Sequence, residues 1–324
     1  MRESRTGTWF QSPEAFDFFS SMPEWFIPFC IGVEESEPRA VSRESGEIRG
    51  VCVGYVTRER SRVKQFFTRR AIITGGPCLA DDATGEEVRL LLEGVKQITN
   101  GRMIEAPIYI ETRNFEDYSP WKEAFTAAGF TYKRHLNFHV NPADYTLSDN
   151  RKRQIRKAES VSVKVERDDA VSEQDVQEWY RILERLYKKK VKTPLWPEKF
   201  FMEAYRQGAG KFMMVKHEGK VIGGSMIVVK NGTVYEWFEC GMNSEYKELY
   251  PSVMATNAGI QWAKEHGYTR YDMMGAGEPD VPYGVRDFKA EFGGQLVEHG
   301  RWMYICNTVL YSIGLAGVKL LKMS

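Results

Sequence analysis

The two halves of this 324-residue chain share a pattern that restricts the fold to a duplicated one. Residues 46–53 (GEIRGVCV) correspond to residues 219–226 (GKVIGGSM), and each segment is expected to form one arm of a hairpin. Each half continues with a long helix, a strand and a short helix ending in glycine, at residues 125–129 (FTAAG) and 288–293 (FKAEFG). Because such a correspondence is typical of a diverged duplication, we expect two α/β units with mixed sheets.

We expect the first unit to span residues 1–146 and the second to span residues 147–299, with residues 300–324 completing the first. The spacing of apolar residues predicts long helices at residues 86–99, 174–189 and 251–266. Alternating or β-branched runs predict strands, which we place at residues 48–56, 66–67, 71–74, 108–111, 137–140, 161–165, 212–217, 221–229, 233–239 and 271–274.

The composition limits the class of protein. Charged residues make up 27% of the chain but nearly cancel, leaving a net charge of +1. This balance excludes a protein that coats nucleic acid through its overall charge, although it leaves room for a local basic groove.

The five cysteines lack CxxC spacing and the five histidines lack ligand spacing, so we expect free thiols and no metal. Because we find no signal peptide and no membrane-spanning run, we expect a cytoplasmic protein.

The most informative local feature is the stretch at residues 271–302. A short strand is expected to end there in a loop whose Gly275 and Gly277 expose backbone N–H groups. Arg286 and Lys289 follow three positions apart, on one face of a helical turn. Exposed N–H groups beside two cations would suit an anion or an oxyanion. The alternative is a structural loop with two solvated cations, since the glycine spacing matches no named phosphate-binding motif.

Lys289 also distinguishes the two halves, because Thr126 stands at the corresponding position of the first. A duplicated fold usually keeps its chemistry in one copy. We therefore expect the active site in the second unit.

Three segments carry a resemblance to a known family: residues 151–160 (RKRQIRKAES), 221–226 (VIGGSM) and 283–294 (YGVRDFKAEFGG). Together with the order of elements they resemble the Fem family (FemA, FemB and FemX), which has tandem GNAT-like domains. Members transfer amino acids from aminoacyl-tRNA to peptidoglycan precursors, so the resemblance implies that activity here. The connection between the helices at 174–189 and 197–207 is short, so the compact FemX-like form without a coiled-coil arm is the nearer relative.

The resemblance also implies roles for particular residues. The pair Phe288-Lys289 matches the family's motif in its catalytic region, where the lysine places the acyl donor or stabilises charge. Proton acceptors are needed as well, and Asp272 and Asp287 are candidates, as are Glu278 and Asp280; the alternative for each is a surface or loop-capping carboxylate. For substrate binding we single out Gly275, Gly277, Tyr283, Arg286, Arg153, Arg156, Lys157 and Lys192. The alternatives for these are core packing of the aromatic ring and solvated faces for the cations.

The donor can be inferred from a missing motif. A GNAT enzyme that uses CoA needs a glycine-containing loop before its long helix to hold the pyrophosphate. Residues 246–259 and 77–87 lack such a loop. This favours aminoacyl-tRNA over acyl-CoA as the donor, with no bound cofactor.

The acceptor and the reaction class stay open. Residues 186–201 resemble Fem-related proteins of surface-polysaccharide systems, so the acceptor is either a peptidoglycan precursor or another polysaccharide precursor. Two other interpretations are an N-acyltransferase that uses acyl-CoA or acyl carrier protein on an amino sugar, and a non-catalytic binding protein. The apolar tail at residues 309–323 is expected to pack on the first unit; a contact with the inner face of the membrane, where lipid-linked acceptors lie, is the alternative. The oligomeric state is not predicted.

Overall fold

The computed structural model describes residues 4–34, 37–39, 48–58, 62–100, 106–191 and 194–323. The chain forms two compact units. Unit 1 contains residues 1–135 and 298–324, and unit 2 contains residues 136–297. The boundaries differ from those expected from the sequence, which placed residues 136–146 in the first unit.

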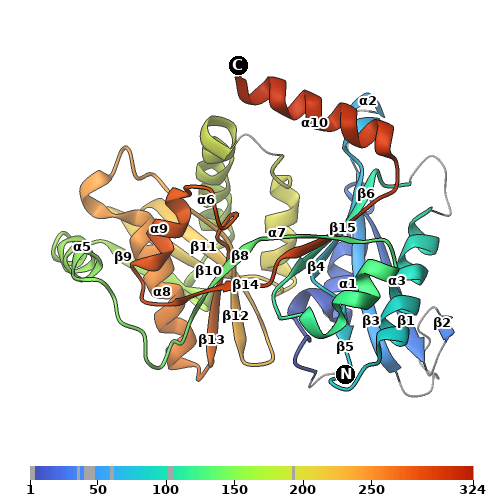
Figure 1. Ribbon diagram of the computed structural model, residues 1–324. Helices are drawn as coiled ribbons and strands as arrows, with labels where there is room; N and C mark the ends of the chain where they lie inside the picture. Colours follow the sequence, from blue (N-terminus) through green and yellow to red (C-terminus); the bar gives the residue numbers. More distant parts are fainter. Residues whose placement is uncertain are drawn as a thin grey trace. The chain divides into compact units, whose positions relative to one another are not determined.

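Unit 1 is built on a mixed sheet with the strand order β2-β1-β3-β4-β6-β15-β7 (Figure 1). A further short strand, β5, pairs with β3. The strands are β1 (Phe26–Glu34), β2 (Glu37–Arg39), β3 (Ile48–Thr57), β4 (Arg70–Gly75), β5 (Cys78–Leu79), β6 (Tyr109–Asn114), β7 (Thr131–Lys133) and β15 (Arg301–Ile305). The helices are α1 (Pro13–Ser20), α2 (Arg62–Thr68), α3 (Gly85–Asn100), α4 (Lys122–Ala127) and α10 (Thr308–Met323).

Unit 2 is built on a second mixed sheet with the order β14-β8-β13-β12-β11-β10-β9. Its strands are β8 (Leu136–Val140), β9 (Lys164–Arg167), β10 (Lys211–His217), β11 (Lys220–Lys230), β12 (Thr233–Gly241), β13 (Arg270–Gly275) and β14 (Gln295–Glu298). Its helices are α5 (Asp149–Ser160), α6 (Glu173–Leu186), the short π-helix η4 (Tyr187–Val191), α7 (Glu198–Arg206), α8 (Pro251–Glu265) and α9 (Gly284–Ala290).

The two units repeat one order of elements. In each, antiparallel strands lead to a long helix, α3 or α8, and then to a strand that pairs in parallel, β6 with β4 and β13 with β12. A short helix follows, α4 or α9. The prediction of a duplicated α/β fold with mixed sheets is therefore confirmed.

Each sheet includes one strand that the order of the chain would not place there. β8 lies between β13 and β14 in unit 2, and β15 lies between β6 and β7 in unit 1. β8 pairs with β13 through Val140 opposite Tyr271 and His139 opposite Asp272. This pairing explains why the first boundary falls before β8 and not after it.

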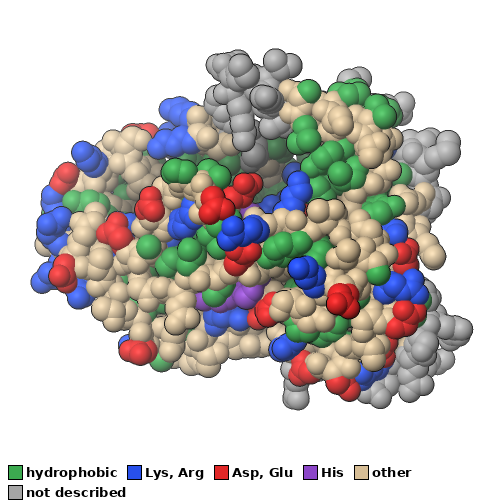
Figure 2. All heavy atoms as spheres, in the orientation of Figure 1, with side chains coloured by type: hydrophobic (Ala, Val, Ile, Leu, Met, Phe, Trp, Pro, Cys, Tyr) green, Lys and Arg blue, Asp and Glu red, His purple; other side chains and the backbone are tan. Residues whose placement is uncertain are grey.

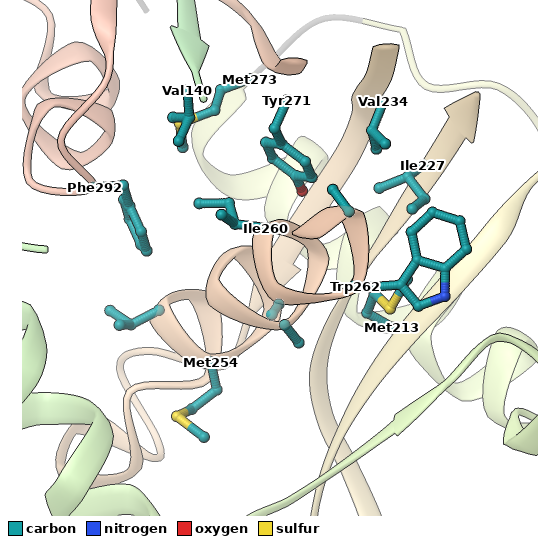
Figure 3. Close-up of a cluster of buried hydrophobic side chains, with 14 of the residues drawn as sticks. Val140, Met213, Ile227, Val234, Met254, Ile260, Trp262, Tyr271, Met273 and Phe292 are labelled. Atoms are coloured by element: carbon teal, nitrogen blue, oxygen red, sulfur yellow. The ribbon is translucent and has the colours of Figure 1, made fainter. Parts of the chain in front are cut away.

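The core of unit 2 forms where α8 packs on its sheet (Figure 3). α8 is apolar around most of its circumference, as expected for a buried helix. Ile260 and Trp262 on α8 lie in one cluster with Tyr271 and Met273 on β13. This packing fixes β13, which carries the candidate site at its end.

Among the local predictions, the strand at residues 66–67 was wrong. Phe66 and Phe67 belong to helix α2 and not to a strand; both rings are exposed, at 49% and 40%, so no sheet partner draws them into extended structure. Strand β1 was not predicted, because Pro28 and Gly32 interrupt its apolar run. The pairing of β1 with β3 along its length stabilises it nevertheless.

Candidate active site

The candidate site lies in unit 2 where β12 and β13 stop pairing. Their parallel register runs only from Thr233 opposite Arg270 to Tyr235 opposite Asp272. On its other side, β12 has a bulge: the register with β11 shifts between Met226 and Ile227, so that Trp237 is one extra residue on β12. A bulge re-aims the side chains that follow it. We infer that this bulge brings Glu236 and Glu239, three positions apart, to the same face of the strand.

Lys289 is buried on α9 and reaches across to the end of β13. Its Nζ donates hydrogen bonds to the carbonyl oxygens of Met273 and Gly275, the latter at 2.7 Å, and lies 3.4 Å from that of Met274. Burial lowers the pKa of Lys289, and the charges of Glu236 and Asp272 oppose that shift. The ammonium group therefore stabilises the irregular end of the strand.

The loop after β13 was expected to expose free backbone N–H groups, but the structure arranges it differently. Met274 has a positive φ of 62°, which turns neighbouring carbonyl groups toward Lys289. The N–H of Ala276 donates to the carbonyl oxygen of Leu136 on β8, at 2.6 Å. Gly277 has a φ of 79°, in the region that favours glycine. The loop thus presents carbonyl oxygens to the lysine, and the amide between the two glycines is already bonded.

Asp272 lies in the interior of unit 2. Its side chain is fully buried, with Oδ2 at 3.2 Å from Nε2 of His139 and Oδ1 accepting the N–H of Met274 at 2.7 Å. Burial alone would raise the pKa of Asp272, but His139 and the N–H of Met274 hold it below its usual value. The structure therefore gives Asp272 a structural place, between β8 and the distorted end of β13.

A pocket of about 320 Å³ opens beside these strands, between the end of β12, the C-terminal end of α6 and α9. Glu239 and Ser252 line its inner part, and Phe288 and Val285 line the side of α9. Arg185, Lys189 and Lys190 line the side of α6 and η4. Glu245 also lines the pocket, 3.9 Å from Arg185. The pocket therefore combines an acidic inner group with a mainly cationic rim, which suits a ligand that carries negative charge outside the reacting group.

Glu239 is the titratable group with the most unusual environment in this pocket. Its Oε1 is buried and has no hydrogen-bond partner among the described residues. Burial, and then the charge of Glu236, raise the pKa of Glu239 to about 8. Glu236 lies deeper, and its Oε1 accepts the hydroxyl of Tyr271 at 3.0 Å. A carboxyl with a pKa near neutrality in a pocket is poised for proton transfer.

The other residues predicted on and near α9 have varied surroundings. Phe288 lines the pocket, whereas Asp287 is exposed. Arg286 donates to the carbonyl oxygens of Pro279, at 3.0 Å, and of Val281, so it stabilises its own loop.

Tyr283 is 41% exposed and packs over Gly277, where a Cβ atom would come within 2.9 Å of its ring. Of these four, only Phe288 lines the pocket.

The basic helix α5 divides into one buried cation and an exposed stripe. Arg151 is 5% exposed; its guanidinium carbon lies 4.6 Å from the centre of the Phe288 ring, and its Nη2 lies 3.4 Å from Glu291. Arg153, Arg156 and Lys157 are exposed, and Lys157 forms an ion pair with Glu248. Lys and Arg side chains gather at the edge of the molecule where Figure 1 draws α5 (Figure 2). These three do not line the pocket, and Lys192 lies outside the described residues.

The N-terminus of α8, where a GNAT enzyme would hold a pyrophosphate, is largely occupied. Pro251 at the first helical position has no N–H. The N–H of Ser252 donates to Oδ1 of Asn243 at 3.3 Å, and that of Met254 bonds to the carbonyl oxygen of Tyr250. Few donors are left here for a phosphate.

The sequence did not point to Glu236 or Glu239. Both stand in a largely apolar segment, TVYEWFECG, for which the sequence predicted only a strand at residues 233–239. Two acidic residues in such a strand are themselves a signal, because a buried carboxyl is rarely kept for packing. The sequence did not single out Arg151 either. It lies in a run of cations whose other members are exposed, so nothing in the sequence marks it as the buried one.

Comparisons with known proteins agree with the fold. Residues 148–289 match the family of the acetyltransferase (GNAT) domain, and this match lies within unit 2. A crystal structure of FemX superposes with a TM-score of 0.68 and 15% identity, covering 96% of both chains. The structure of L-PGS from Bacillus licheniformis gives a TM-score of 0.60 and 12% identity, covering 96% of this chain and 93% of that one. The chain therefore has a FemX-like tandem GNAT fold, as predicted.

One curated protein is similar in sequence. It is the Lipid II:glycine glycyltransferase of Staphylococcus saprophyticus, 33% identical over 101 residues. The match covers 30% of this chain and 24% of that protein.

Proposed function

We propose that this chain transfers an aminoacyl group from aminoacyl-tRNA to an amine of a peptidoglycan precursor or another cell-envelope precursor, with the reaction in unit 2. The observation that carries the proposal is the carboxyl of Glu239, which stands in the pocket of a GNAT unit with a buried, unbonded Oε1 and a pKa of about 8. An amine acceptor must lose a proton as it attacks, and this carboxyl is the group in the pocket best suited to take it.

The reaction needs no covalent intermediate, because the aminoacyl ester is already activated. The amine nitrogen attacks the ester carbonyl carbon, so that a C–N bond forms and the C–O bond to the ribose breaks. One proton passes from the amine to Glu239, and one proton is delivered to the departing ribose oxygen. Since the same carboxyl can return the proton it took, the step balances without a further reactant.

Two observations support the choice of donor and acceptor. The N-terminus of α8 is closed by Pro251 and Asn243, which disfavours the diphosphate of CoA. The similarity to a Lipid II:glycine glycyltransferase supports an amino acid as the transferred group and a lipid-linked precursor as the acceptor. Such an acceptor would bring the protein to the inner face of the membrane. The cationic rim of Arg185, Lys189 and Lys190 suits the phosphates that either substrate carries.

The test compares donors and acceptors directly. Purified protein is mixed with charged tRNA or acetyl-CoA and with either lipid II or an amino sugar, and the release of uncharged tRNA or of CoA thiol is followed. We expect uncharged tRNA to appear only when an acceptor is present. Glu239→Gln should lower turnover by roughly 100- to 10,000-fold. Glu159→Gln, at an exposed carboxyl on α5, is the matched control and should leave turnover unchanged.

Release of CoA thiol in place of tRNA would instead assign the chain to the N-acyltransferases that use CoA. If Glu239→Gln retains full turnover at every pH, Glu239 is not the base. If neither donor reacts with any acceptor, the result favours a non-catalytic binding protein.

A further inference from the structure

Helix α10 lies on unit 1 through a narrow contact face. Leu310, Tyr311 and Gly314 are its half-buried positions, and they share one side of the helix. The ring of Tyr311 lies 5.7 Å from that of Tyr109 on β6, and its hydroxyl lies 3.4 Å from Sδ of Met303 on β15. This face accounts for the attachment of the helix to the unit.

α10 also carries exposed apolar residues outside this contact face, which a simple surface helix would not. Val309 is 66% exposed, Ile313 is 49% exposed and Leu315 is 55% exposed. Val309 and Ile313 are four residues apart and therefore point to the same side. Exposing these side chains to water has a cost that a polar sequence would avoid.

Helix α2 adds two exposed aromatic rings next to α10. It packs beside α10, and a Cβ atom at Gly314 would lie 3.8 Å from the carbonyl oxygen of Phe67. Phe66 and Phe67 are 49% and 40% exposed. Hydrophobic side chains gather where Figure 1 draws α2 and the start of α10 (Figure 2). We call the exposed apolar set of Phe66, Phe67, Val309 and Ile313 the α2–α10 face; Leu315, two positions from Ile313, points to another side of α10.

The charges in these two helices are of one sign. Neither α2 (RVKQFFT) nor α10 (TVLYSIGLAGVKLLKM) contains an aspartate or a glutamate. The sequence of α2 contributes Arg62 and Lys64, and that of α10 contributes Lys319 and Lys322. Each lysine or arginine near an anionic bilayer contributes about 1 kcal/mol of attraction. Apolar side chains together with cations and no acidic residue are typical of segments that lie in the plane of a membrane interface.

We propose that the α2–α10 face docks on the surface of a bilayer that contains anionic lipid. No helix within the described ranges is long and apolar enough to cross a membrane, so the contact is peripheral. A second copy of the chain fits less well, because the charged residues in the sequences of both helices are all basic. The inference does not depend on the transfer reaction, since it concerns a surface of unit 1 and binding alone.

The first test measures sedimentation of the full chain with vesicles. We expect binding to vesicles of phosphatidylglycerol and phosphatidylcholine, weaker binding to phosphatidylcholine alone, and a decrease with added salt. The variant Phe67→Ser/Val309→Ser/Ile313→Ser should lower the partition coefficient by tenfold or more, about the loss expected for removing several apolar contacts. The control Val161→Ser/Leu296→Ser changes exposed apolar residues of unit 2 and should bind as the parent does.

A second measurement reports the location of the face itself. Fluorescence of Ile313→Trp should shift to shorter wavelength when phosphatidylglycerol vesicles are added, relative to the parent protein, whereas Leu296→Trp should not add such a shift. The proposal is overturned if the triple variant binds vesicles as well as the parent does. It is also overturned if the parent binds no vesicles, and in that case a dimer on gel filtration that the triple variant abolishes would identify a second copy as the occupant.

Discussion

Lys289 illustrates how a single buried cation can stabilise a strand end. Its ammonium group bonds to the carbonyl oxygens of Met273 and Gly275, so Lys289→Met would leave two buried acceptors without a donor. We expect a loss of about 1–3 kcal/mol in the free energy of unfolding, measured by urea denaturation. The control Lys164→Met, at an exposed position on β9, should change it by less than about 0.5 kcal/mol.

The same variant separates two roles for the lysine. A group that only stabilises the oxyanion would lose turnover without a loss of stability. An unchanged midpoint in urea, with turnover lowered, would therefore contradict the structural role and restore the one expected from the sequence.

The raised pKa of Glu239 predicts how turnover depends on pH. Its pKa in the folded chain is raised to about 8, and only the ionised carboxyl can accept a proton. Turnover at saturating substrate should therefore rise with pH and level off above about pH 8. A flat profile between pH 6 and 9 would exclude Glu239 as the base.

The free energy of unfolding should fall as pH rises, in contrast to turnover. Because the folded pKa lies above the unfolded value of 4.5, the folded state binds the proton more tightly, and this contribution is lost as pH rises through about 8. Glu239→Gln removes the titration, so its stability relative to the parent should increase between pH 5 and pH 9. Denaturation at several pH values measures this difference.

At the scale of single residues, the sequence identified Lys289 but not Glu239. Lys289 could be nominated because its counterpart in the first half is Thr126. Its hydrogen-bond partners could not be predicted, because they depend on the positive φ of Met274. Glu239 could not be placed in a pocket either, since the bulge at Trp237 decides which way it faces.

At the scale of elements, Arg151 connects α5 with α9. Its guanidinium group stacks on the rings of Phe288 and Phe292 and donates to the carbonyl oxygen of Phe288 at 3.3 Å. Arg151→Met should lower the free energy of unfolding by about 1–3 kcal/mol, because it removes these contacts and the ion pair with Glu291, which keeps its hydrogen bonds from Ser148 and Asn150. It should also raise the KM of any substrate held in the pocket that Phe288 lines.

Arg153→Met is the matched control for this prediction. Arg153 stands two positions further along the same helix, is exposed, and donates only to Asn150 at 2.8 Å among the hydrogen bonds described. Equal losses of stability in the two variants, measured by chemical denaturation, would show that the buried contacts of Arg151 contribute nothing specific.

The elements that the sequence predicted best are those with long apolar periods. Helices α3, α6 and α8 begin and end within a few residues of the expected limits, because one apolar face specifies α3 and α6 and a long, mostly apolar run specifies α8. Short elements were less predictable. Helix α2 has two adjacent aromatic residues that suit a strand equally well, and β1 depends on its pairing with β3, which no local pattern shows.

At the scale of the whole molecule, the sequence predicted the duplication and the assignment of residues 300–324 to the first unit, but not the unit of β8 or the strands between which β8 and β15 lie. The correspondence between halves relates segments such as 46–53 and 219–226, which stay within their own units. β8 and β15 are short, and their positions are decided by pairing with β13 and β6. Pairing between strands far apart in the chain leaves no periodic signal in either strand.

The placement of β15 leads to a prediction for shortened chains. β15 lies between β6 and β7, and Trp302 on it is 3% exposed and stacks on Phe125 at 4.9 Å. A chain that ends after Gly300 loses this strand and exposes the edges of both neighbours. We expect unit 1 to lose its cooperative unfolding transition, whereas unit 2, whose sheet includes no residue beyond Glu298, should keep its own.

A chain that ends after Asn307 is the matched control, because it keeps β15 and removes only α10. No position of α10 among residues 308–316 is fully buried, so its removal should change the melting temperature by a few degrees at most. Circular dichroism during heating and the denaturant m-value distinguish the two shortened chains. If the chain ending after Gly300 melts like the one ending after Asn307, β15 is not needed to close the sheet of unit 1.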